Sequence, residues 1–503
     1  MTTQEQKRRA FIKTMLLAGA SIYLPSCKPK TPSTTPNTEI PPNTSNPPIE
    51  EKPDTIEEQV EQIDELFKSE NVVFFRMEDA EYSDLNVGFN LRVPKQPKII
   101  ALCKNEEGIA ESVKYAKQYK LQVCVKSGGH SFEGFSSNDG GMCINLSLLK
   151  EVEWLDDNTV KLGCGLTLKE IYDALLPKGK IIPAGSCAGV GIGGLALGGG
   201  YGLFGRKFGL TCDSMKALTL IDGNGKIHKA KNEDELLWAC RGGGNGNFGV
   251  VANMTFKAHE APKTFTRHLF KAYKLDVTRA KSLLQKWFEM TAQLPNSCFG
   301  AYVLNGKTLT VLITDAENRI AEIKPLLDTF STSMDKTTIG EVETDLPKSL
   351  KRYYGIQTPL YFKNACAGLY KGFADIEGCI EAVIQKVHEN PGLIYQVNTL
   401  GGEIANPDFE AVSAYPHRSY PYLSELQAYY EKDTQGQKLV TAFQEIQTIF
   451  TNHGISAHYR NYPDIHFENW ETAYYGKNYP RLQQIKRKYD GENVIWHEQS
   501  VKV

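Results

Sequence analysis

The chain has 503 residues and a net charge of −2, with 57 Lys and Arg against 59 Asp and Glu. Hydrophobic residues make up 41% of it and charged residues 23%, which is the balance of a folded globular protein with more than one domain. No segment forms a basic stripe, which argues against nucleic acid as a partner.

The first 27 residues follow the pattern of an export signal. Arg8 and Arg9 precede an apolar stretch from Met15 to Leu24, and Cys27 follows it. Paired arginines are typical of twin-arginine export, and a cysteine at this place is typical of bacterial lipoproteins. We therefore expect an exported protein of the cell envelope, periplasmic or at the surface, that contacts the membrane only through a lipid on Cys27. An uncleaved anchor or an unmodified thiol is the alternative, although the apolar stretch is short for a membrane span.

Residues 28–54 are rich in Pro, Thr and Asn and predict a disordered tether, and residues 56–67 carry apolar side chains at helical spacing. Beyond them, short apolar runs alternate with amphipathic stretches, which predicts an α/β unit with a ligand loop at a strand end. We expect strands at Ile99–Leu102, Leu121–Val125, Gly141–Leu146 and Val160–Gly163, and helices at Glu106–Tyr119 and Leu166–Leu176.

Ten glycines fall within the 21 residues from Gly185 to Gly205. Residues 189–194 match the spacing of the dinucleotide-binding fingerprint, but that motif needs a helix directly after its glycines. Gly198, Gly199 and Gly200 follow almost at once, and glycine weakens helices, so we do not expect the helix of that motif here. The glycine run instead predicts close approach of the backbone to a bulky cofactor.

The rest of the chain divides into two patterns. After the glycine run we expect a second α/β stretch, with a strand at Ala217–Ile221 and a helix at Asn232–Cys240. Beyond residue 265, strand-like stretches of mixed polarity and long helices predict an antiparallel sheet with helices on one face. The strands of this sheet are expected at Phe299–Leu304 and Thr308–Thr314, and the helices at 281–294 and 375–388. A further strand is expected in the C-terminal tail, at Val494–Trp496. The expected fold class is therefore α+β.

The chain has 11 cysteines and no Cys-x-x-Cys pair. This spacing excludes a zinc ribbon, and no metal site is predicted. Cys124 and Cys143 lie in apolar runs and are expected to be buried small hydrophobic residues. Disulfide pairing of other cysteines in an exported protein stays open.

The loop Lys126-Ser127-Gly128-Gly129-His130-Ser131 follows an expected strand. Consecutive backbone N–H groups after a strand form a nest for an anion such as a pyrophosphate. His130 would then lie beside the molecule that carries the anion, whereas a histidine that only caps a turn is the alternative. Cys187, at the head of the glycine run, would in isolation be interpreted as a buried structural thiol.

Five segments, in order, resemble the berberine bridge enzyme-like group of the vanillyl-alcohol oxidase superfamily, the FAD-linked oxidases with a PCMH-type FAD-binding domain. The segments are residues 126–131, residues 183–202, residues 238–251, Tyr459-Arg460-Asn461-Tyr462-Pro463-Asp464 and Tyr474-Tyr475-Gly476-Lys477-Asn478. The chain is most similar in these segments to bicovalent oligosaccharide oxidases, and the resemblance covers roughly residues 93–500. Together with the patterns above, it predicts an export signal with lipobox at 1–27, a tether at 28–54, an FAD-binding domain at 55–262, a substrate-binding domain at 263–455 and a C-terminal segment at 456–503 that returns to the FAD domain.

The resemblance implies a specific cofactor linkage. In bicovalent members of the group, a His in the Gly-Gly-His-Ser loop binds the flavin 8α-methyl and a Cys ahead of the glycine run binds C6. The matching residues are His130 and Cys187, and two such links would fix the flavin and raise its potential. The other residues expected to bind FAD are Lys126, Ser127, Gly128, Gly129, Ser131, Val190, Gly191, Gly194, Gly249, Val251, Asn461 and Asn478.

Val190 bears on the electron acceptor. In the group, a small β-branched residue at this place accompanies access of oxygen to the flavin, and Leu blocks it. We therefore expect oxygen as the acceptor, with release of hydrogen peroxide. Plain packing of Val190 is the alternative, and the enzyme would then be a dehydrogenase that uses a quinone or a carrier protein.

Oxidation of an alcohol at a flavin also needs a base that takes the hydroxyl proton. Tyr459 matches the Tyr-x-Asn motif that supplies this base in relatives, so we expect Tyr459 to accept the proton. A phenol of pKa ~10 needs a neighbour that favours the phenolate for this role. A core aromatic residue is the alternative. Glu425 and Gln427 lie two apart in an expected strand, and therefore on one face. Which of them faces the flavin stays open.

Aromatic residues are dense in the last hundred residues, which favours a groove in which sugar rings stack. We expect an FAD-dependent oxidase acting on an alcohol, with the anomeric hydroxyl of a mono- or oligosaccharide as the favoured substrate. A non-catalytic flavin- or glycan-binding lipoprotein is the alternative from another class.

Overall fold

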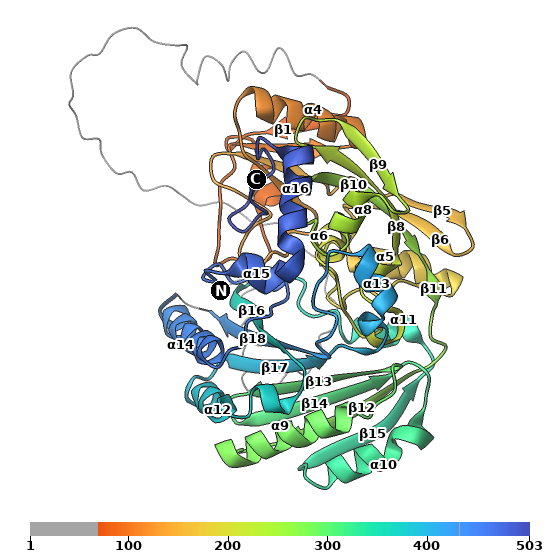
Figure 1. Cartoon of the computed structure of the whole chain (residues 1–503), viewed down its shortest axis with the longest axis vertical. Coiled ribbons are helices and arrows are strands. Elements are labelled where there is room, and N and C mark those ends of the chain that lie inside the picture. Colours follow the sequence, from red (N-terminus) through yellow and green to blue (C-terminus); the bar gives the residue numbers. More distant parts are fainter. Residues whose placement is uncertain (1–68, 432) are drawn as a thin grey trace, which may run out of the picture. The chain divides into compact units, whose positions relative to one another are not determined.

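The computed structural model describes residues 69–431 and 433–503 (Figure 1). The export signal, the lipid site at Cys27, the tether and the helix expected at 56–67 lie outside the described residues.

The described fold begins with a four-stranded sheet. Its strands, β1 (Val72–Phe75), β2 (Ile99–Cys103), β3 (Val123–Lys126) and β4 (Met142–Asn145), lie in the order β1-β2-β4-β3. β2 and β3 each pair parallel with β4, and β1 pairs antiparallel with β2. Two helices belong to this part: α3 (Tyr82–Asn86) and α4 (Glu106–Gln118), whose first turn is capped by the Asn105 side chain. β3 ends at Lys126, so the Gly-Gly-His loop follows a strand as expected.

A second sheet has five strands, all antiparallel. It contains β5 (Val152–Asp156), β6 (Thr159–Gly163), β10 (Gly249–Lys257), β8 (Met215–Asp222) and β9 (Ile227–Lys231), in that spatial order. The strands and α8 (Glu235–Cys240) occur where the second α/β stretch was expected, but the pairing differs from the α/β expectation. The turn between β8 and β9 is too short for the crossover that a parallel pair needs.

Between these sheets the chain forms short elements around the glycine run. α5 (Leu168–Leu175) begins with a capping box of Thr167 and Glu170 and is followed by β7 (Lys180–Ile181), which pairs with β11 (His259–Glu260). The absence of a helix after the first glycines was a wrong expectation, because α6 (Ile192–Leu197) begins directly after Gly191. Packing and capping compensate for the weak propensity: the Leu197 carbonyl accepts the N–H groups of Gly242 (3.1 Å) and Gly244 (3.0 Å). Gly198 ends the helix after six residues, and α7 (Gly205–Phe208) follows.

The third sheet has seven antiparallel strands in the order β15-β12-β14-β13-β17-β18-β16. The strands are β12 (Phe265–Ala272), β13 (Cys298–Asn305), β14 (Thr308–Asp315), β15 (Lys336–Glu343), β16 (Tyr361–Tyr370), β17 (Leu393–Thr399) and β18 (Tyr422–Tyr430).

One face of this sheet packs against four helices and forms a large hydrophobic core (Figure 1). The helices are α9 (Val277–Thr291), α10 (Ile320–Ser331), α12 (Ile380–Glu389) and α14 (Asp433–Asn452), while α11 (Leu346–Lys351) and α13 (Pro407–Val412) are short. An antiparallel sheet backed by helices, after the two smaller sheets, confirms the α+β fold class.

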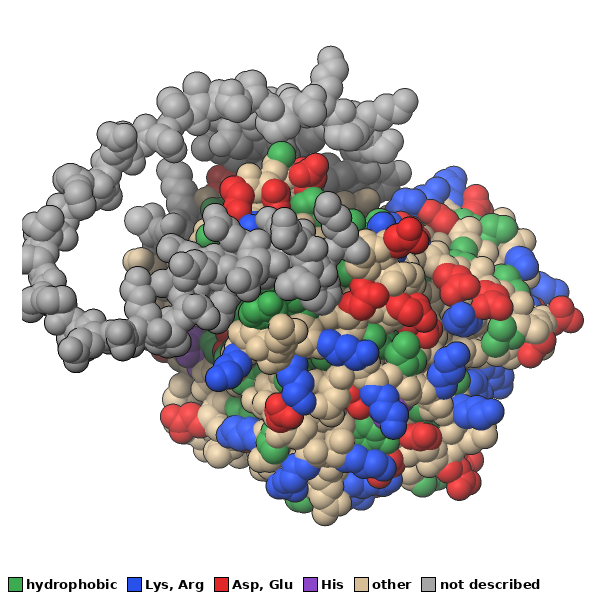
Figure 2. All heavy atoms as spheres, turned by 90° about the horizontal axis from the view of Figure 1, so that it is seen from above, with side chains coloured by type: hydrophobic (Ala, Val, Ile, Leu, Met, Phe, Trp, Pro, Cys, Tyr) green, Lys and Arg blue, Asp and Glu red, His purple; other side chains and the backbone are tan. Residues whose placement is uncertain are grey.

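The C-terminal segment contains α15 (Trp470–Tyr475) and α16 (Tyr479–Asp490) and then passes beside β3, where Ile495 forms a parallel bridge with Val123. The strand expected at Val494–Trp496 is this single bridge. The domain boundaries given above stay predictions. None of the helices in the described part of the chain has the length and apolar character needed to cross a membrane. On the face seen in Figure 2, Lys and Arg side chains alternate with Asp and Glu rather than forming a patch of one sign.

Candidate active site

The loop after β3 packs directly on the glycine run. A Cβ at Gly128 would lie 2.3 Å from the Gly191 nitrogen, and a Cβ at Gly191 would lie 2.2 Å from the Gly128 nitrogen. Gly129 has φ +69°, a left-handed conformation that glycine adopts without strain. Ser127 Oγ donates to the Cys164 carbonyl at 2.5 Å. The two segments therefore meet backbone to backbone, at a separation that only glycine permits.

His130 lies against the same glycine run. Its ring stacks on Phe89, with centroids 4.0 Å apart, and a Cβ at Gly189 would lie 2.7 Å from the His130 Nε2. Burial lowers the pKa of His130 to about 4. The imidazole is therefore neutral at physiological pH, with a nitrogen lone pair free of a proton, as a nucleophile requires.

Cys187 lies two residues before Gly189. It is the one exposed thiol among the ten cysteines of the described residues, none of which forms a disulfide. Cys124 and Cys143 are buried, as expected. The residue is exposed, but many protein atoms surround its sulfur and partly remove it from water. This desolvation is the larger cause that raises the pKa of the Cys187 thiol to about 11, and the charge of Glu425 is the smaller one. Cys187 is thus an accessible, protonated thiol near a carboxyl group.

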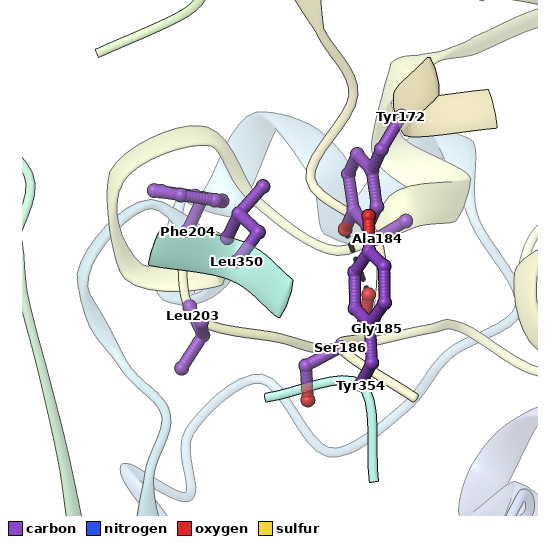
Figure 3. A pocket seen from close by; sticks show the side chains of 8 residues that line it. All are labelled: Tyr172, Ala184, Gly185, Ser186, Leu203, Phe204, Leu350 and Tyr354. Carbon is purple, nitrogen blue, oxygen red and sulfur yellow. Dashed lines mark hydrogen bonds between the residues drawn. The ribbon is translucent and has the colours of Figure 1, made fainter. Parts of the chain in front are cut away.

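The segment that leads to Cys187 lines a small pocket and is fixed by hydrogen bonds (Figure 3). Tyr172 of α5 donates its hydroxyl proton to the Gly185 carbonyl at 2.7 Å, and the Ala188 N–H donates to the Tyr354 carbonyl at 3.0 Å. The pocket is lined by Tyr172, Ala184, Gly185, Ser186, Leu203, Phe204, Leu350 and Tyr354. These contacts fix the backbone on both sides of Cys187.

Two of the predicted FAD-binding side chains stabilise the loop itself. Lys126 Nζ donates to the carbonyls of Leu85 (2.6 Å) and Val87 (2.7 Å), so its charge caps the C-terminal end of α3. Ser131 Oγ accepts the Phe135 N–H at 3.0 Å. Both side chains therefore stabilise the 126–131 loop through hydrogen bonds to protein groups.

Four others lie in the glycine run or in β10. Val190 is half-buried, and its N–H donates to the Cys187 carbonyl at 3.2 Å. Gly194 is exposed on α6, and a Cβ there would meet no atom within 4 Å. Gly249 opens β10 with φ +158° and Val251 is buried in the same strand.

The three C-terminal residues named from the motifs support the backbone. Tyr459 OH accepts the Gly200 N–H at 2.8 Å and the Asn461 Nδ2 at 3.1 Å, and burial raises the pKa of Tyr459 above its ordinary value. Asn461 Nδ2 also donates to the Leu195 carbonyl at 2.9 Å. Asn478 Nδ2 donates to the Ala414 carbonyl at 3.0 Å. Tyr459 thus lies behind the glycine run as a hydrogen-bond acceptor, with a pKa shift opposite to the one a base needs.

Glu425 occupies the face of β18 opposite the helices. Leu426 and Ala428 point into the helix-covered core, so Glu425 and Gln427 alternate to the other face. Glu425 is 6% exposed, and burial raises its pKa to about 8. Its charge contributes to the raised pKa values of Cys187 and Tyr201, which places the carboxyl group near the glycine run.

A chain of polar side chains extends from Gln427 across the sheet. Gln427 Nε2 donates to Gln396 Oε1 (3.1 Å), and Gln396 Nε2 donates to Asn398 Oδ1 (2.9 Å). Asn398 Nδ2 then donates to the Tyr201 hydroxyl at 3.1 Å. Asn364 of β16 donates to Glu425 at 3.3 Å. Sequence reasoning missed Gln396, Asn398 and Asn364, because their only signal is a polar residue at alternate positions, and the register that joins them is set by pairing with β18.

The residues present fit a flavin nucleotide. The glycine backbone adjoins the neutral imidazole of His130, and Cys187, two residues before Gly189, is exposed. The Oδ1 atoms of Asn245 and Asn364 are buried and have no hydrogen-bond partner in the described part of the chain, so each can accept a hydrogen bond from a ligand. No group of His, Cys, Asp and Glu among residues 69–431 and 433–503 has the arrangement to hold a metal ion.

Comparisons with known proteins identify FAD-linked relatives. Residues 97–231 match the family described as FAD binding domain, and residues 458–502 match the family described as Berberine and berberine like. The FAD-linked oxidoreductase YgaK of Bacillus subtilis, itself uncharacterized, is 28% identical over 440 residues, which is 84% of this chain and 95% of YgaK. A chitooligosaccharide oxidase of Gibberella zeae is 27% identical over 446 residues, 82% of this chain and 89% of that enzyme.

Solved structures share the fold. The xylooligosaccharide oxidase from Myceliophthora thermophila C1, in complex with xylobiose, superposes with a TM-score of 0.75 at 21% identity, over 86% of this chain and 97% of the other. The FAD-binding family match and the FAD-linked relatives therefore define an FAD-dependent oxidoreductase. The chain is similar to berberine bridge enzyme-like FAD-linked oxidases, and its residues 458–502 match the berberine-like family model.

Proposed function

We propose that this protein oxidises an alcohol, with the anomeric hydroxyl of a mono- or oligosaccharide as the favoured substrate, and passes the electrons to oxygen. The observation that carries the proposal is Glu425, a buried carboxyl group with a pKa of about 8 whose charge acts on Cys187. A pKa near the working pH is what a general base needs. The oligosaccharide oxidases among the relatives and structural neighbours support the choice of a sugar.

In this proposal the cofactor and each group of side chains have separate roles. Bound FAD supplies the acceptor for a hydride from the carbon that carries the hydroxyl. Glu425, once deprotonated, accepts the proton of that hydroxyl. The amides of Gln427, Gln396 and Asn398 bind the remaining hydroxyl groups, because a neutral amide both donates and accepts. Tyr459 holds the Gly200 N–H in place, and its role as the base is the alternative that a variant tests below.

We propose covalent links from His130 and Cys187 to the flavin. The neutral imidazole of His130 and the accessible thiol of Cys187 support them. Oxygen as the acceptor is supported by Val190, a small half-buried residue in the turn between Cys187 and Gly191. Replacement of Val190 by Leu is expected to slow reoxidation of the flavin by air and to spare its reduction by substrate, whereas a dehydrogenase with a quinone or carrier acceptor would be insensitive to it.

Export through the twin-arginine route, and a lipid on Cys27 in the cell envelope, complete the proposal. They rest on residues 1–27 of the sequence alone. The tether at residues 28–54 would then separate the enzyme from the membrane surface.

The decisive experiment is the intact mass of the purified mature protein after acid denaturation. A mass increase of one FAD with retained yellow colour is expected, and the double variant His130→Ala, Cys187→Ala should lose both. An unmodified wild-type mass would contradict the covalent links. Anaerobic bleaching of the flavin by a panel of sugars then tests the substrate class, and a panel that leaves the flavin oxidised would favour the non-catalytic binding protein.

A further inference from the structure

A buried lysine on β16 joins three segments that each carry part of the site. Lys363 Nζ donates to Glu133 and, at 2.8 Å, to Asp464 Oδ1. The three side chains are between 0% and 3% exposed. Nζ also lies 5.4 Å from the centre of the Phe443 ring. The ammonium group is thus enclosed by two carboxylates and an aromatic ring.

Each partner leads to a different part of the site. Glu133 follows His130 by three residues, and Asp464 follows Tyr459 by five. Lys363 itself directly precedes Asn364, which donates to Glu425. One charged group therefore connects the proposed flavin anchor, the C-terminal segment and the strand beside the proposed base.

Further hydrogen bonds tie both carboxylates to their segments. Glu133 Oε2 accepts from Arg92 at 2.5 Å, and Arg92 Nε donates to the Phe362 carbonyl at 3.1 Å, next to Lys363. Asp464 Oδ1 accepts the His466 N–H at 3.1 Å, and its Oδ2 accepts Gln447 Nε2 of α14 at 3.3 Å.

The physical consequence is mutual dependence. A buried ammonium is strongly unfavourable unless its partners are in place, and the same holds for each buried carboxylate. In the C-terminal segment, Asp464 accepts from Lys363, and the Ile465 N–H donates to Glu133 Oε1 at 3.4 Å. The backbone of this segment also binds the edge strand β16: the Tyr462 carbonyl accepts the Cys366 N–H and the Ala457 carbonyl accepts the Leu369 N–H, both at 2.9 Å. Displacement of that segment would remove one partner of Lys363 and loosen the hold on Glu133.

We propose that Lys363 is a positioning residue that makes covalent attachment of the flavin at His130 depend on a docked C-terminal segment. The inference rests on the proposed function for the link itself. Formation of that link joins the imidazole nitrogen to the flavin methyl carbon and breaks one N–H and one C–H bond. The two protons released, together with two electrons, reduce the flavin ring, and oxygen, the acceptor of the proposed function, reoxidises it to give hydrogen peroxide. The reaction requires His130 to lie close to the methyl carbon in the right orientation, and Lys363 holds the segment that carries His130 in that position.

The test compares Lys363→Met with Lys486→Met. Lys486 is an equally buried lysine, paired with Asp490 at 2.6 Å, but it has no contact with Glu133 or Asp464. FAD is added to flavin-free full-length chains, and the growth of the FAD-bearing mass is followed after acid quenching. We expect attachment to slow by roughly 10- to 100-fold in Lys363→Met and to stay within about threefold of wild type in Lys486→Met at matched folded fraction. Equal attachment rates in wild type and folded Lys363→Met would overturn the proposal.

Two further measurements keep the test decisive. If Lys363→Met does not fold, Asp464→Asn preserves the shape of the group, removes one charge and should slow attachment in the same direction. Amide hydrogen exchange of residues 131–135 and 457–466 should rise in the Lys363 variant and not in the Lys486 variant. A wild-type chain without covalent flavin would contradict the proposed function, and unchanged exchange in both segments would then separately contradict the positioning role.

Discussion

The site has two walls, one formed by backbone and the other by side chains. One wall is backbone: the loop at 126–131 and the glycine run meet at distances that exclude a Cβ. The other wall is side chains: Glu425, Gln427, Gln396 and Asn398 project from β17 and β18. The backbone wall is neutral and preformed, whereas the side-chain wall carries a carboxyl group whose pKa burial has raised.

The comparison separates two kinds of constraint. The backbone wall accepts only glycine at Gly128 and Gly191, because any side chain there would collide with the opposite segment. A side-chain wall keeps its shape when a residue is exchanged, and only the chemistry changes. We therefore expect substitutions in the backbone wall to affect cofactor retention, and substitutions in the side-chain wall to affect turnover and substrate affinity.

The largest expected effect is that of Glu425→Gln. The amide has nearly the same shape as the carboxyl group but cannot take a proton, so reduction of the flavin by substrate should slow by roughly 10²- to 10⁴-fold. Stopped-flow absorbance of the flavin under anaerobic conditions measures this rate. Flavin content should match wild type, and a variant that is reduced at the wild-type rate would remove Glu425 from the role of base.

The backbone wall is broken by Gly128→Ala. The new Cβ would lie 2.3 Å from the Gly191 nitrogen and 2.7 Å from the Gly189 carbonyl oxygen, so the segments must separate, at a stability cost of about 1–3 kcal/mol and with loss of most bound flavin. Gly194→Ala is the matched variant: its Cβ meets no protein atom within 4 Å, so stability should hold while flavin content falls. Thermal unfolding and the ratio of flavin to protein absorbance distinguish the two, and equal behaviour would contradict the division of roles.

The pH dependence sharpens the contrast between the walls. Glu425 has its pKa raised from 4.5 to about 8, so reduction by substrate should rise up to tenfold per pH unit and level off above about pH 8. In the same window the folded protein holds a proton that the unfolded chain has released, so stability contributed by this group falls between pH 4.5 and 8. Glu425→Gln should remove both trends. In the flavin-free protein His130 has the opposite sign: its lowered pKa makes the folded state lose stability as pH falls below 6.5.

The backbone wall could be predicted from the sequence more fully than the side-chain wall. The Gly-Gly-His loop and the glycine run are local motifs, so His130, Cys187 and their neighbours could be named and their class of ligand inferred. Strand β18 could also be expected, with Glu425 and Gln427 on one face. Gln396 and Asn398 could not, because their place beside Gln427 depends on the register of β17 against β18, which joins residues about 30 positions apart.

Helix α6 and the roles of Lys126 and Tyr459 show the same limit. Propensity disfavours a helix among glycines, yet tertiary caps from Gly242 and Gly244, distant in the sequence, stabilise it. Lys126 lies in a ligand motif, but its charge is used by the carbonyls of Leu85 and Val87. The sequence names the residues of a motif and leaves the direction of each side chain to the packing.

The smallest expected effect distinguishes the two candidate bases. Tyr459→Phe removes the acceptor of the buried Gly200 N–H and one of the two acceptors of the half-buried Asn461 Nδ2. It should cost about 1–3 kcal/mol of stability while slowing flavin reduction by less than about tenfold. Urea unfolding and anaerobic stopped-flow measure the two effects on one preparation. If reduction instead falls more than a hundredfold while stability and flavin content hold, Tyr459 is the proton acceptor, and the chemistry of the site belongs to the backbone wall rather than to the side chains of β18.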